Sequence, residues 1–334
     1  MTFAEALSRF QTGNPDGILH PEAGLRLPDK VLIRGETAVA EYFRAHPELF
    51  SGLVPISPDS EVTVTFKNNG GALIKIFAYE GKIGKIVEFR PDDIRQRLKL
   101  TIEYDGTDFS GFQIQPEGRT VQDELQKAVS LINGAPTAVT GASRTDAGVH
   151  ALGQVVHFDT KHLFTEDKWV QILRHALPPD IGVVSLEYTH PLFHARYDVE
   201  WKEYRYILHF GSPSAFLRNR EWTVDPSLNR SRLAQEMQKI VGTHDFSAFC
   251  KGANPDGVRT IFQAETADFG DRLHLRFVGD GFLHNMIRLL VGSMVEIASG
   301  RSEIDITALL SDRSRRHTRF LAPAGGLYLV SVHY

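Results

Sequence analysis

Residues 141–158 read GASRTDAGVHALGQVVHF, a loop of small side chains that runs into an alternating strand. The glycines Gly141 and Gly148 leave room for a backbone or a ligand to approach closely. Asp146 would project from this loop, and the strand Gln154–Phe158 would give the loop a rigid base. From these residues alone, Asp146 is either a functional carboxylate or a helix-cap or Asx-turn residue.

The sequence on both sides of this loop alternates between strand and helix patterns. Period-2 alternation predicts strands, and apolar residues spaced three and four apart predict helices. The expected strands are Leu98–Tyr104, Gln154–Phe158, Ile181–Tyr188, Glu203–Phe210, Leu273–Val278 and Leu327–Val332, and the expected helices are one that follows a capping box at Thr120, then Glu166–Leu177, Ser231–Val241, Leu283–Ala298 and Ile304–Leu310. Because these elements mix without a strict βαβ repeat, we predict an α+β fold with a mainly antiparallel central sheet flanked by helices. It would span residues 98–334 as two α/β halves with a break near residues 200–215.

The first ninety residues form a separate pattern, in which helices precede an antiparallel meander. The expected helices are Phe3–Phe10 and Glu36–Ala45, and the expected strands are Glu61–Lys67, Ala72–Tyr79 and Ile83–Phe89. This order predicts a small α+β accessory domain over residues 1–90. The charged residues 91–97 would form a linker.

The composition is that of a soluble globular protein: of 334 residues, 42% are hydrophobic and 23% are charged. We expect no membrane span and no secretory signal, since no apolar run reaches about 18 residues and the first residues lack a basic region followed by an apolar core. One cysteine, Cys250, excludes an intrachain disulfide framework and fits a cytoplasmic protein. The 14 histidines lack paired metal-ligand spacing, so no metal site is expected.

The charge balance does not indicate a nucleic-acid-binding protein, because the formal net charge is −4. Residues 1–96 carry 11 basic and 13 acidic side chains and the remainder carries 26 and 28, so each part contributes −2. An RNA partner would therefore have to meet a local basic surface. The best linear candidate is the run Arg313–Arg319, which is either a phosphate contact or a solvated helix end or loop.

Residues 141–158 resemble, nearly residue for residue, the signature loop of the TruA family of tRNA pseudouridine synthases. The resemblance covers Leu98–Tyr334, about 70% of the chain. Several ordered motifs carry it outside the loop: Tyr104-Asp105-Gly106, Gly111-Phe112-Gln113-Ile114-Gln115, Val121-Gln122, Phe193-His194-Ala195-Arg196, Tyr204-Arg205-Tyr206, His244-Asp245-Phe246-Ser247-Ala248-Phe249 and Gly326-Leu327-Tyr328-Leu329-Val330.

The resemblance implies the pseudouridine-synthase fold and a role for each matching residue. Asp146 would be the catalytic aspartate, and Arg144 would enter the RNA stack to help extrude the target nucleotide. Tyr204 would pack against the target uracil, and Arg288 would pair with Asp146. Other residues expected at the substrate or RNA are Thr145, Gly148, His150, Phe282 and Leu327. The resemblance further implies a cytoplasmic homodimer that modifies uridines 38–40 in the anticodon arm of tRNA.

The chemistry of pseudouridine formation suits these residue types. The reaction breaks the N1–C1′ bond, turns the uracil and joins C5 to C1′, so substrate and product are isomers and we expect neither a redox cofactor nor a metal. A glycosidase needs two carboxylates because it activates water. Here water must be excluded, and one ionised carboxylate such as Asp146 could attack the sugar or remove a proton from it. The sequence leaves both routes open.

Two further positions have a structural interpretation beside the functional one. Arg288 lies in an otherwise apolar helix, where a cation is rarely buried without a partner. It would snorkel, bind Glu296 or Asp280, or form an ion pair with Asp146. Tyr204 shares a strand face with a second tyrosine two residues on, so it is either a core aromatic or a platform for a flipped base. Phe282 likewise lines the pocket or belongs to the core.

Three functions are compatible with the sequence of the chain. The first is an active synthase that binds tRNA, and the second is a catalytically dead relative retained for RNA binding or folding. The intact set Arg144, Asp146, Tyr204 and Arg288 favours the first over the second. In the third, the N-terminal domain is the functional centre, but no acid–base pair stands out in residues 1–96.

The N-terminal segment resembles the SnoaL/NTF2-like family, whose domains are small cone-shaped barrels. The resemblance rests on two short patterns, Arg34–Phe43 and Glu80–Ile86. It implies a cone-barrel fold and no active site, so the segment would serve dimerisation, RNA docking or ligand binding. This extension is the departure of the sequence from the TruA pattern.

Overall fold

The structure is a computed structural model of the 334-residue chain. It describes residues 19–26, 32–34, 36–45, 54–60, 63–67, 73–79, 82–89, 96–190, 193–251, 257–312, 316–318 and 320–334. Contacts between Cα atoms divide the chain into two units, Met1–Arg95 and Gln96–Tyr334. The predicted helix Phe3–Phe10 and residues 91–95 of the predicted linker lie outside the described residues.

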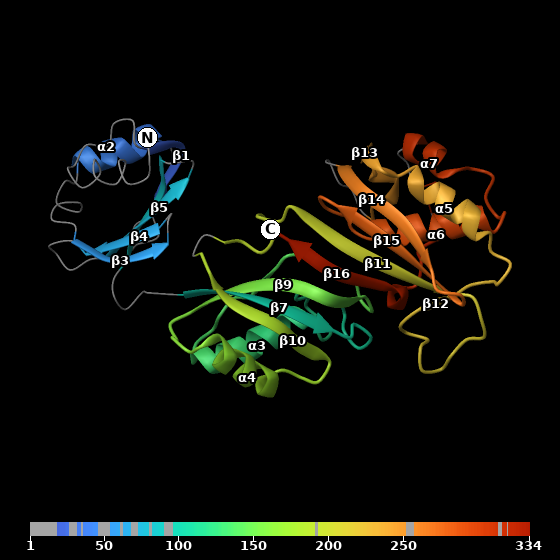
Figure 1. Ribbon diagram of the computed structural model, residues 1–334, viewed down its shortest axis with the longest axis horizontal. Helices are drawn as coiled ribbons and strands as arrows, with labels where there is room; N and C mark the ends of the chain where they lie inside the picture. The colour runs from blue at the N-terminus through green and yellow to red at the C-terminus, as the bar shows by residue number, and fades with distance from the viewer. Residues whose placement is uncertain are drawn as a thin grey trace. The chain divides into compact units, whose positions relative to one another are not determined.

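The first unit contains a six-stranded sheet and one described helix, drawn in blue in Figure 1. Its elements are β1 (Leu19–Arg26), β2 (Leu32–Arg34), α2 (Glu36–Ala45), β3 (Val54–Ser60), β4 (Thr63–Lys67), β5 (Leu73–Tyr79) and β6 (Lys82–Phe89). The strands follow the order β2-β1-β6-β5-β4-β3, with β1 and β6 parallel and the other pairs antiparallel.

Helix α2 has the predicted bounds, and it buries Val39, Ala40 and Phe43 because these side chains share one helical face. The meander β4–β5–β6 confirms the three predicted strands to within two residues at each end. Strands β1 and β3 were not predicted. Two prolines, Pro55 and Pro58, lie in β3, and proline removes a backbone donor and so masks a strand pattern.

The second unit is built on one ten-stranded sheet. Its strands are β7 (Gln96–Tyr104), β8 (Thr140–Gly141), β9 (His150–Thr160), β10 (Ile181–Thr189), β11 (Trp201–His209), β12 (Trp222–Thr223), β13 (Gly242–Asp245), β14 (Val258–Asp268), β15 (Arg272–Gly279) and β16 (Leu327–His333). The main order is β10-β7-β9-β16-β11-β15-β14-β13, while β12 pairs with β11 and β8 with β9. Only β9–β16 and β11–β12 are parallel among the described pairs, so the predicted mainly antiparallel sheet is confirmed.

Helices flank both halves of this sheet (Figure 1). They are α3 (Val121–Asn133), α4 (Glu166–Ala176), α5 (Arg230–Gln238), α6 (Met286–Ala298) and α7 (Ile306–Asp312). Helices α3 and α4 accompany β7, β9 and β10, whereas α5, α6 and α7 accompany the half that contains β14 and β15. The Thr120 hydroxyl accepts the backbone N–H of Asp123, so the predicted cap of α3 is present.

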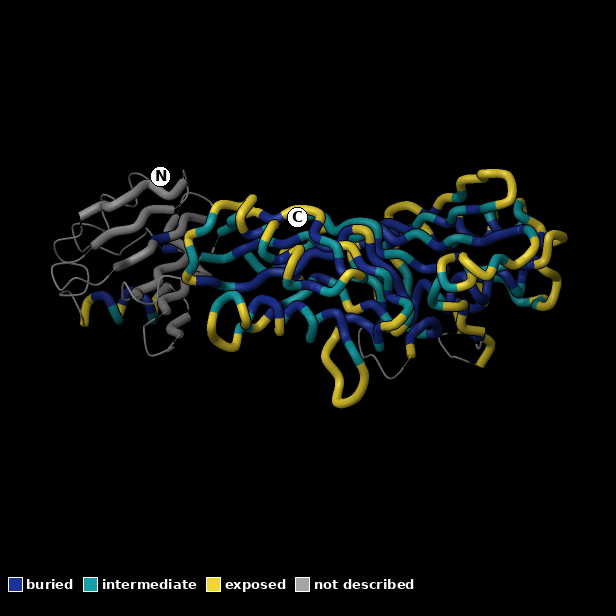
Figure 2. Tube along the Cα trace, turned by 90° about the horizontal axis from the view of Figure 1, so that it is seen from below, coloured by how far each residue is buried: buried dark blue, intermediate teal, exposed yellow. Residues whose placement is uncertain are grey.

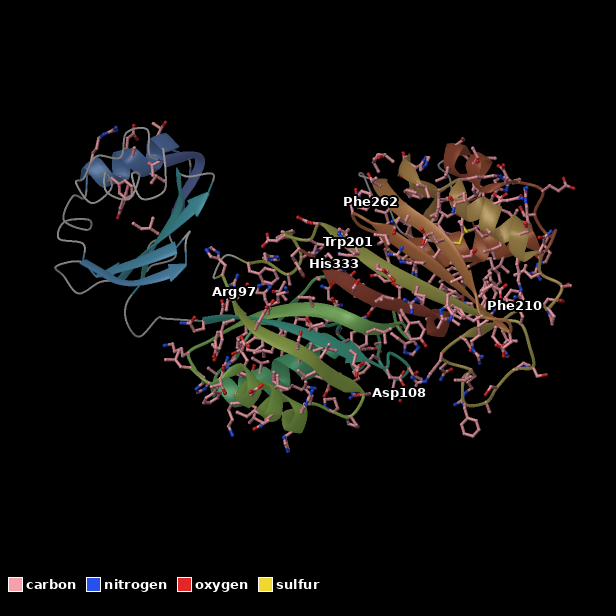
Figure 3. The ribbon with its side chains drawn as sticks, in the orientation of Figure 1. Arg97, Asp108, Trp201, Phe210, Phe262 and His333 are labelled. Carbon is pink, nitrogen blue, oxygen red and sulfur yellow. The ribbon has the colours of Figure 1, made fainter. Side chains whose placement is uncertain are left out.

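Strand β16 joins the two halves, because it lies between β9 and β11 although it comes last of the sheet's strands in the chain. Its parallel register with β9 places Tyr328 beside His150. A side chain at Gly153 would put its Cβ 2.5 Å from the Val330 carbonyl oxygen, so only glycine permits this approach. At one end of the β11–β16 pair, Trp201 stacks on His333 with ring centroids 3.4 Å apart (Figure 3).

The core of the second unit runs through the sheet and the helices that cover it. Figure 2 shows buried residues along the strands and exposed residues gathered at loops. The largest fully buried side chains in this unit are Trp169, Tyr206, Phe158, Phe246, Phe249 and Phe277. Tyr206 is therefore a core aromatic, and its hydroxyl donates to the Pro323 carbonyl oxygen at 2.7 Å.

Several boundaries differ from the prediction by two or more residues. Strand β7 starts at Gln96, inside the expected linker, and β9 starts at His150 rather than Gln154. Helix α6 starts at Met286 rather than Leu283, because Asn285 has a φ of 63° and a left-handed residue ends the helical path. The chain crosses from one half to the other between β10 and β11, just before the expected residues 200–215.

Candidate active site

Asp146 lies in the loop between β8 and β9, at the side of the sheet where the two halves meet. The loop turns tightly after it: the Val149 N–H donates to the Asp146 carbonyl oxygen at 3.1 Å. Gly148 makes this turn with a φ of 77°, which favours glycine, and its N–H donates to the Phe109 carbonyl oxygen. The backbone of the loop is therefore held on a neighbouring segment as well as by its own strand.

Side chains from two strands hold the residues before Asp146. The Gln154 side chain accepts the Ser143 N–H at 3.2 Å and donates to the Ser143 carbonyl oxygen at 2.7 Å. The Thr145 hydroxyl is hydrogen-bonded to the Tyr104 hydroxyl at 2.7 Å, and both residues are buried. Such closed pairs of neutral groups fix a loop without placing charge in it.

The structure brings Arg288 and Asp146 together, as the sequence led us to expect. Arg288 Nη1 donates to Asp146 Oδ2 at 3.1 Å, and the side chains are 13% and 18% exposed. Arg288 Nε also donates to the Ala322 carbonyl oxygen at 2.8 Å. The two other partners considered for Arg288 are engaged elsewhere: Glu296 pairs with Arg301, and Asp280 accepts the Thr260 N–H.

Two neighbours of the Asp146 carboxylate were missed by the sequence. The side-chain amide of Asn285 donates to Asp146 Oδ2, and His284 Nε2 lies 3.6 Å from Oδ1. Both residues stand just before α6. An asparagine at that position ordinarily indicates a helix cap, so the sequence carried a signal for a boundary and none for a contact with a residue 139 positions away.

Tyr204 is buried beside the same loop. Its hydroxyl is hydrogen-bonded to the Ser143 hydroxyl at 2.7 Å, and its ring meets Phe282 edge-on with centroids 5.2 Å apart. Burial raises the pKa of Tyr204 to about 12, and the negative charge of Asp146 adds to this effect. The phenol is therefore neutral at physiological pH, and it could donate a hydrogen bond or pack against a base.

The remaining predicted site residues fall into two groups. Arg144 is exposed at the loop surface, and its guanidinium has no hydrogen bond or ion pair with the residues that the structure describes. His150 is 2% exposed, with Nδ1 accepting the Gly106 N–H at 3.0 Å and Nε2 2.7 Å from the Asn219 carbonyl oxygen. Leu327 is also buried, at the start of β16. Because His150 and Leu327 are buried, their side chains contact other parts of the protein and not the surface of the site.

Lys202 on β11, a half-buried lysine, also contacts the loop. Lys202 Nζ donates to the Ala142 carbonyl oxygen at 2.9 Å. Burial lowers the pKa of Lys202 to about 8, and the positive charges of Arg196 and Arg259 lower it further. Positive charge therefore gathers around Lys202, and the sequence did not indicate this because Arg259 lies on a different strand, β14.

Other sequence candidates give less. In the basic run Arg313–Arg319, residues 313–315 and 319 lie outside the described residues, and Arg316 and His317 are exposed. Within the described ranges, no group of three or more His, Cys, Asp or Glu side chains is arranged to hold a metal ion. Nor does any helix in this part of the chain have the length and apolar character to cross a bilayer.

Comparison with known sequences identifies one family. A family model described as tRNA pseudouridine synthase matches residues 100–198 and 237–334. A tRNA pseudouridine synthase A from an Exiguobacterium species is 41% identical over 242 residues, which cover 72% of this chain and 98% of the relative. The protein of that name from Geobacillus kaustophilus is 43% identical over 244 residues, covering 72% and 95%.

Solved structures give only distant likenesses. An archaeal box H/ACA sRNP Nop10-Cbf5 complex matches 60% of this chain and 43% of its own, at 10% identity and a TM-score of 0.28. An NTF-2 like protein from Burkholderia xenovorans matches 26% and 80%, at 17% identity and a TM-score of 0.21. Neither likeness is close enough to bear on the fold.

We predict that Arg288→Ala lowers the free energy of unfolding by roughly 3–5 kcal/mol, because it leaves the Asp146 carboxylate mostly buried without its cation. Urea denaturation measures the change. Arg301→Ala is the matched control, since Arg301 pairs with Glu296 at the end of the same helix but is 60% exposed. That control should cost no more than about 1 kcal/mol. Equal effects of the two changes would contradict the role of the buried pair.

We predict that Lys202→Met stabilises the protein at pH 7 and that this gain shrinks above pH 8. The folded pKa of about 8 lies below the ordinary 10.5. Between these values the unfolded chain binds more protons, so stability rises with pH there and the penalty for the buried charge is complete only below pH 8. The difference between the two pKa values corresponds to a stabilisation of at most about 3 kcal/mol. The lost hydrogen bond to Ala142 subtracts about 1 kcal/mol from this gain.

Urea denaturation of variant and wild type at pH 7, 8, 9 and 10 checks this prediction. Lys168→Met, at an exposed position on α4, is the control and should change stability by about 0.5 kcal/mol or less at each pH. A Lys202→Met protein less stable than wild type at pH 7 would show that the bond to the loop outweighs the cost of burying the charge.

Proposed function

The chain belongs to the tRNA pseudouridine synthase A family, and on that premise we propose that Asp146 is the catalytic carboxylate of the isomerisation. The chain is an isomerase that converts uridine in tRNA to pseudouridine. The observation that carries the proposal is the contact between Asp146 and Arg288 beside the buried Tyr204, since it gathers a charge, its counterion and an aromatic ring around one loop.

The surroundings of Asp146 suit a reaction at C1′ of the ribose. Arg288 places a positive charge beside the carboxylate, and the neutral pairs around Ser143 and Thr145 add no competing charge. The low exposure of Asp146 and Arg288 limits the access of water, whose attack on C1′ would leave an abasic site. The carboxylate would act either by covalent attack on C1′ or by removing a proton from the sugar, and both routes need one ionised aspartate.

Tyr204 and Arg144 would handle the base. Tyr204 would pack against the uracil, and stacking of roughly 1–3 kcal/mol offsets part of the cost of flipping the nucleotide. Since burial raises the pKa of Tyr204 to about 12, its hydroxyl would act as a neutral hydrogen-bonding group. Arg144, exposed beside Asp146, would enter the RNA stack in place of the extruded nucleotide.

The other predicted site residues would shape the pocket. Phe282 would line it, since it contacts the Tyr204 ring. Gly148 would allow close approach of the substrate to the turn after Asp146. Thr145, His150 and Leu327 are buried, so we assign them to support of the loop and of β16.

We propose that the target uridines are positions 38–40 of the tRNA anticodon arm and that the enzyme acts in the cytoplasm as a homodimer that grips tRNA across both subunits. Recognition would depend on RNA shape and on extruded bases, because no linear motif here reads an RNA sequence. Positive charge from Lys202, Arg196 and Arg259 beside the loop supports contact with the phosphate backbone.

We propose a division of labour between the two units. Residues 98–334 would form the catalytic domain, and residues 1–90 a small accessory domain of the SnoaL/NTF2-like cone-barrel type. The helix α2 and the six-stranded sheet of the first unit support this assignment. Its role would be dimerisation, RNA docking or ligand binding.

We expect Asp146→Asn to abolish isomerisation while tRNA affinity stays within about threefold of wild type, because the amide keeps the shape of the carboxylate and loses its charge. Tritium release from uracil C5 of labelled tRNA measures turnover, and it also separates an active enzyme from an inactive RNA-binding relative. Pseudouridine mapping of total RNA from cells with wild type, variant or no protein tests positions 38–40.

Asp268→Asn is the control for this change, because Asp268 is an exposed residue that pairs with Arg230. Its turnover should stay within about twofold of wild type. Persistent turnover by Asp146→Asn would sink the mechanism, and unchanged RNA maps at positions 38–40 would sink the assigned targets.

A chain that begins at Gln96 should retain kcat within about threefold on tRNA, since the family match starts at residue 100 and the second unit has its own core. Steady-state kinetics and gel-filtration mass compare it with the full chain. A rise in KM alone would assign RNA docking to the first unit, and a smaller oligomer would assign dimerisation to it. A folded but inactive product would contradict the division of labour.

A further inference from the structure

Asn285 combines three features that are rarely found together. Asn285 is 9% exposed, and its side-chain amide donates to Asp146 Oδ2. Its φ of 63° is the only positive φ of a non-glycine residue in the described part of the chain. A left-handed backbone costs an L-residue free energy and persists where the surroundings impose it. The backbone conformation that places the Asn285 side chain at the carboxylate is therefore unfavourable in free energy by itself.

The position of Asn285 makes its contact unusual. It immediately precedes α6, where an asparagine side chain normally accepts a backbone N–H of the first turn. Asn229 does this for α5: its φ is −73°, and its side chain accepts the Arg232 N–H at 2.9 Å. Asn285 makes no such capping bond. Its amide faces Asp146 instead, so α6 starts without a side-chain cap.

The two carboxylate oxygens of Asp146 are treated differently. Oδ2 receives both Asn285 and Arg288, which stand three residues apart at the start of α6. Among the residues that the structure describes, the polar neighbour of Oδ1 is His284 Nε2 at 3.6 Å, and the His284 side chain is 59% exposed. Two donors on one oxygen oppose rotation of the carboxylate about its Cβ–Cγ bond. Oδ1 is then the oxygen left for the substrate.

On this basis, and resting on the proposed function of Asp146, we propose that Asn285 is a positioning residue that fixes the carboxylate with Oδ1 turned toward the ribose of the target uridine. Arg288 supplies a positive charge beside the carboxylate, and Asn285 supplies a second, uncharged restraint on its orientation. Holding a reacting group in its productive orientation contributes to the rate rather than to substrate affinity.

The choice of asparagine follows from two demands on this position. The backbone conformation is tolerated by glycine, asparagine, aspartate and histidine better than by other residues. Glycine has no donor, and aspartate would set a second carboxylate against Asp146, where like charges disfavour ionisation of both. Asparagine accepts the conformation and donates a hydrogen bond without adding charge.

The test compares Asn285→Gly with Asn285→Ala in the full-length enzyme. Glycine removes the amide and keeps the left-handed conformation without strain, whereas alanine removes the amide and adds strain. We expect kcat, measured by tritium release, to fall roughly 10- to 100-fold in both variants, as for loss of a hydrogen bond to a charged group. The Kd for tRNA should stay within about twofold. The Tm of Asn285→Ala should lie roughly 3–6 °C below that of Asn285→Gly, because both variants lose the amide and only alanine adds strain in the left-handed conformation.

Asn229→Gly is the matched control, because it makes the same substitution at an ordinary helix cap. It should lower Tm slightly and leave kcat unchanged. The proposal is overturned if Asn285→Gly keeps wild-type kcat, if its defect lies in the Kd for tRNA with kcat retained, or if its Tm falls with that of Asn285→Ala, since the residue would then be a structural cap. Inactive Asp146→Asn beside fully active Asn285→Gly would refute this inference alone, whereas active Asp146→Asn would refute the proposed function.

Discussion

The ion pair between Asp146 and Arg288 is the contact on which the rest of the molecule is organised. The two residues lie 142 positions apart, one on the loop before β9 and the other on α6. Each half of the sheet therefore provides one partner, and the charged centre exists only when both halves are in place. Removing two charges from water is costly, and further hydrogen bonds offset part of this cost: Arg288 Nε donates to the Ala322 carbonyl oxygen, and the Asn285 amide donates to the same carboxylate oxygen as Arg288.

The loop that carries the aspartate is held almost entirely by uncharged groups. The Gln154 side chain is hydrogen-bonded to both the N–H and the carbonyl oxygen of Ser143. The Tyr104 hydroxyl is hydrogen-bonded to the Thr145 hydroxyl, and the Tyr204 hydroxyl to the Ser143 hydroxyl. Burial keeps both phenols neutral by raising their pKa values. A single negative charge thus stands in a rigid, nearly neutral surrounding, which is the arrangement that makes electrostatic effects on a substrate strong. Positive charge gathers around Lys202, whose ammonium contacts the same loop at Ala142, and an RNA backbone would supply anions there.

The sequence predicted the α+β class, the helix pattern and six of the strands of the main sheet, because most of these segments carry apolar residues at alternating positions, as in β7. It missed β14, in which only Ile261 and Ala264 are buried and a bulge between Ile261 and Gln263 breaks the alternation. It placed Asp146 and Arg288 in one site through a family resemblance, whereas the apolar helix alone left other carboxylates open to Arg288. It could not find Asn285, since a contact across 139 residues and a left-handed backbone leave no periodic mark.

The place of β16 in the sheet has a consequence for how the protein is made. Leu327–His333 follows every other strand of its sheet along the chain, yet it lies in the middle, between β9 and β11. A nascent chain that has not yet released this segment from the ribosome has two long unpaired edges, which invite pairing with other chains. The final closing step also joins segments distant in sequence, which slows folding. We therefore expect synthesis, rather than the finished enzyme, to be the stage at which this protein is most prone to aggregate and most dependent on chaperones.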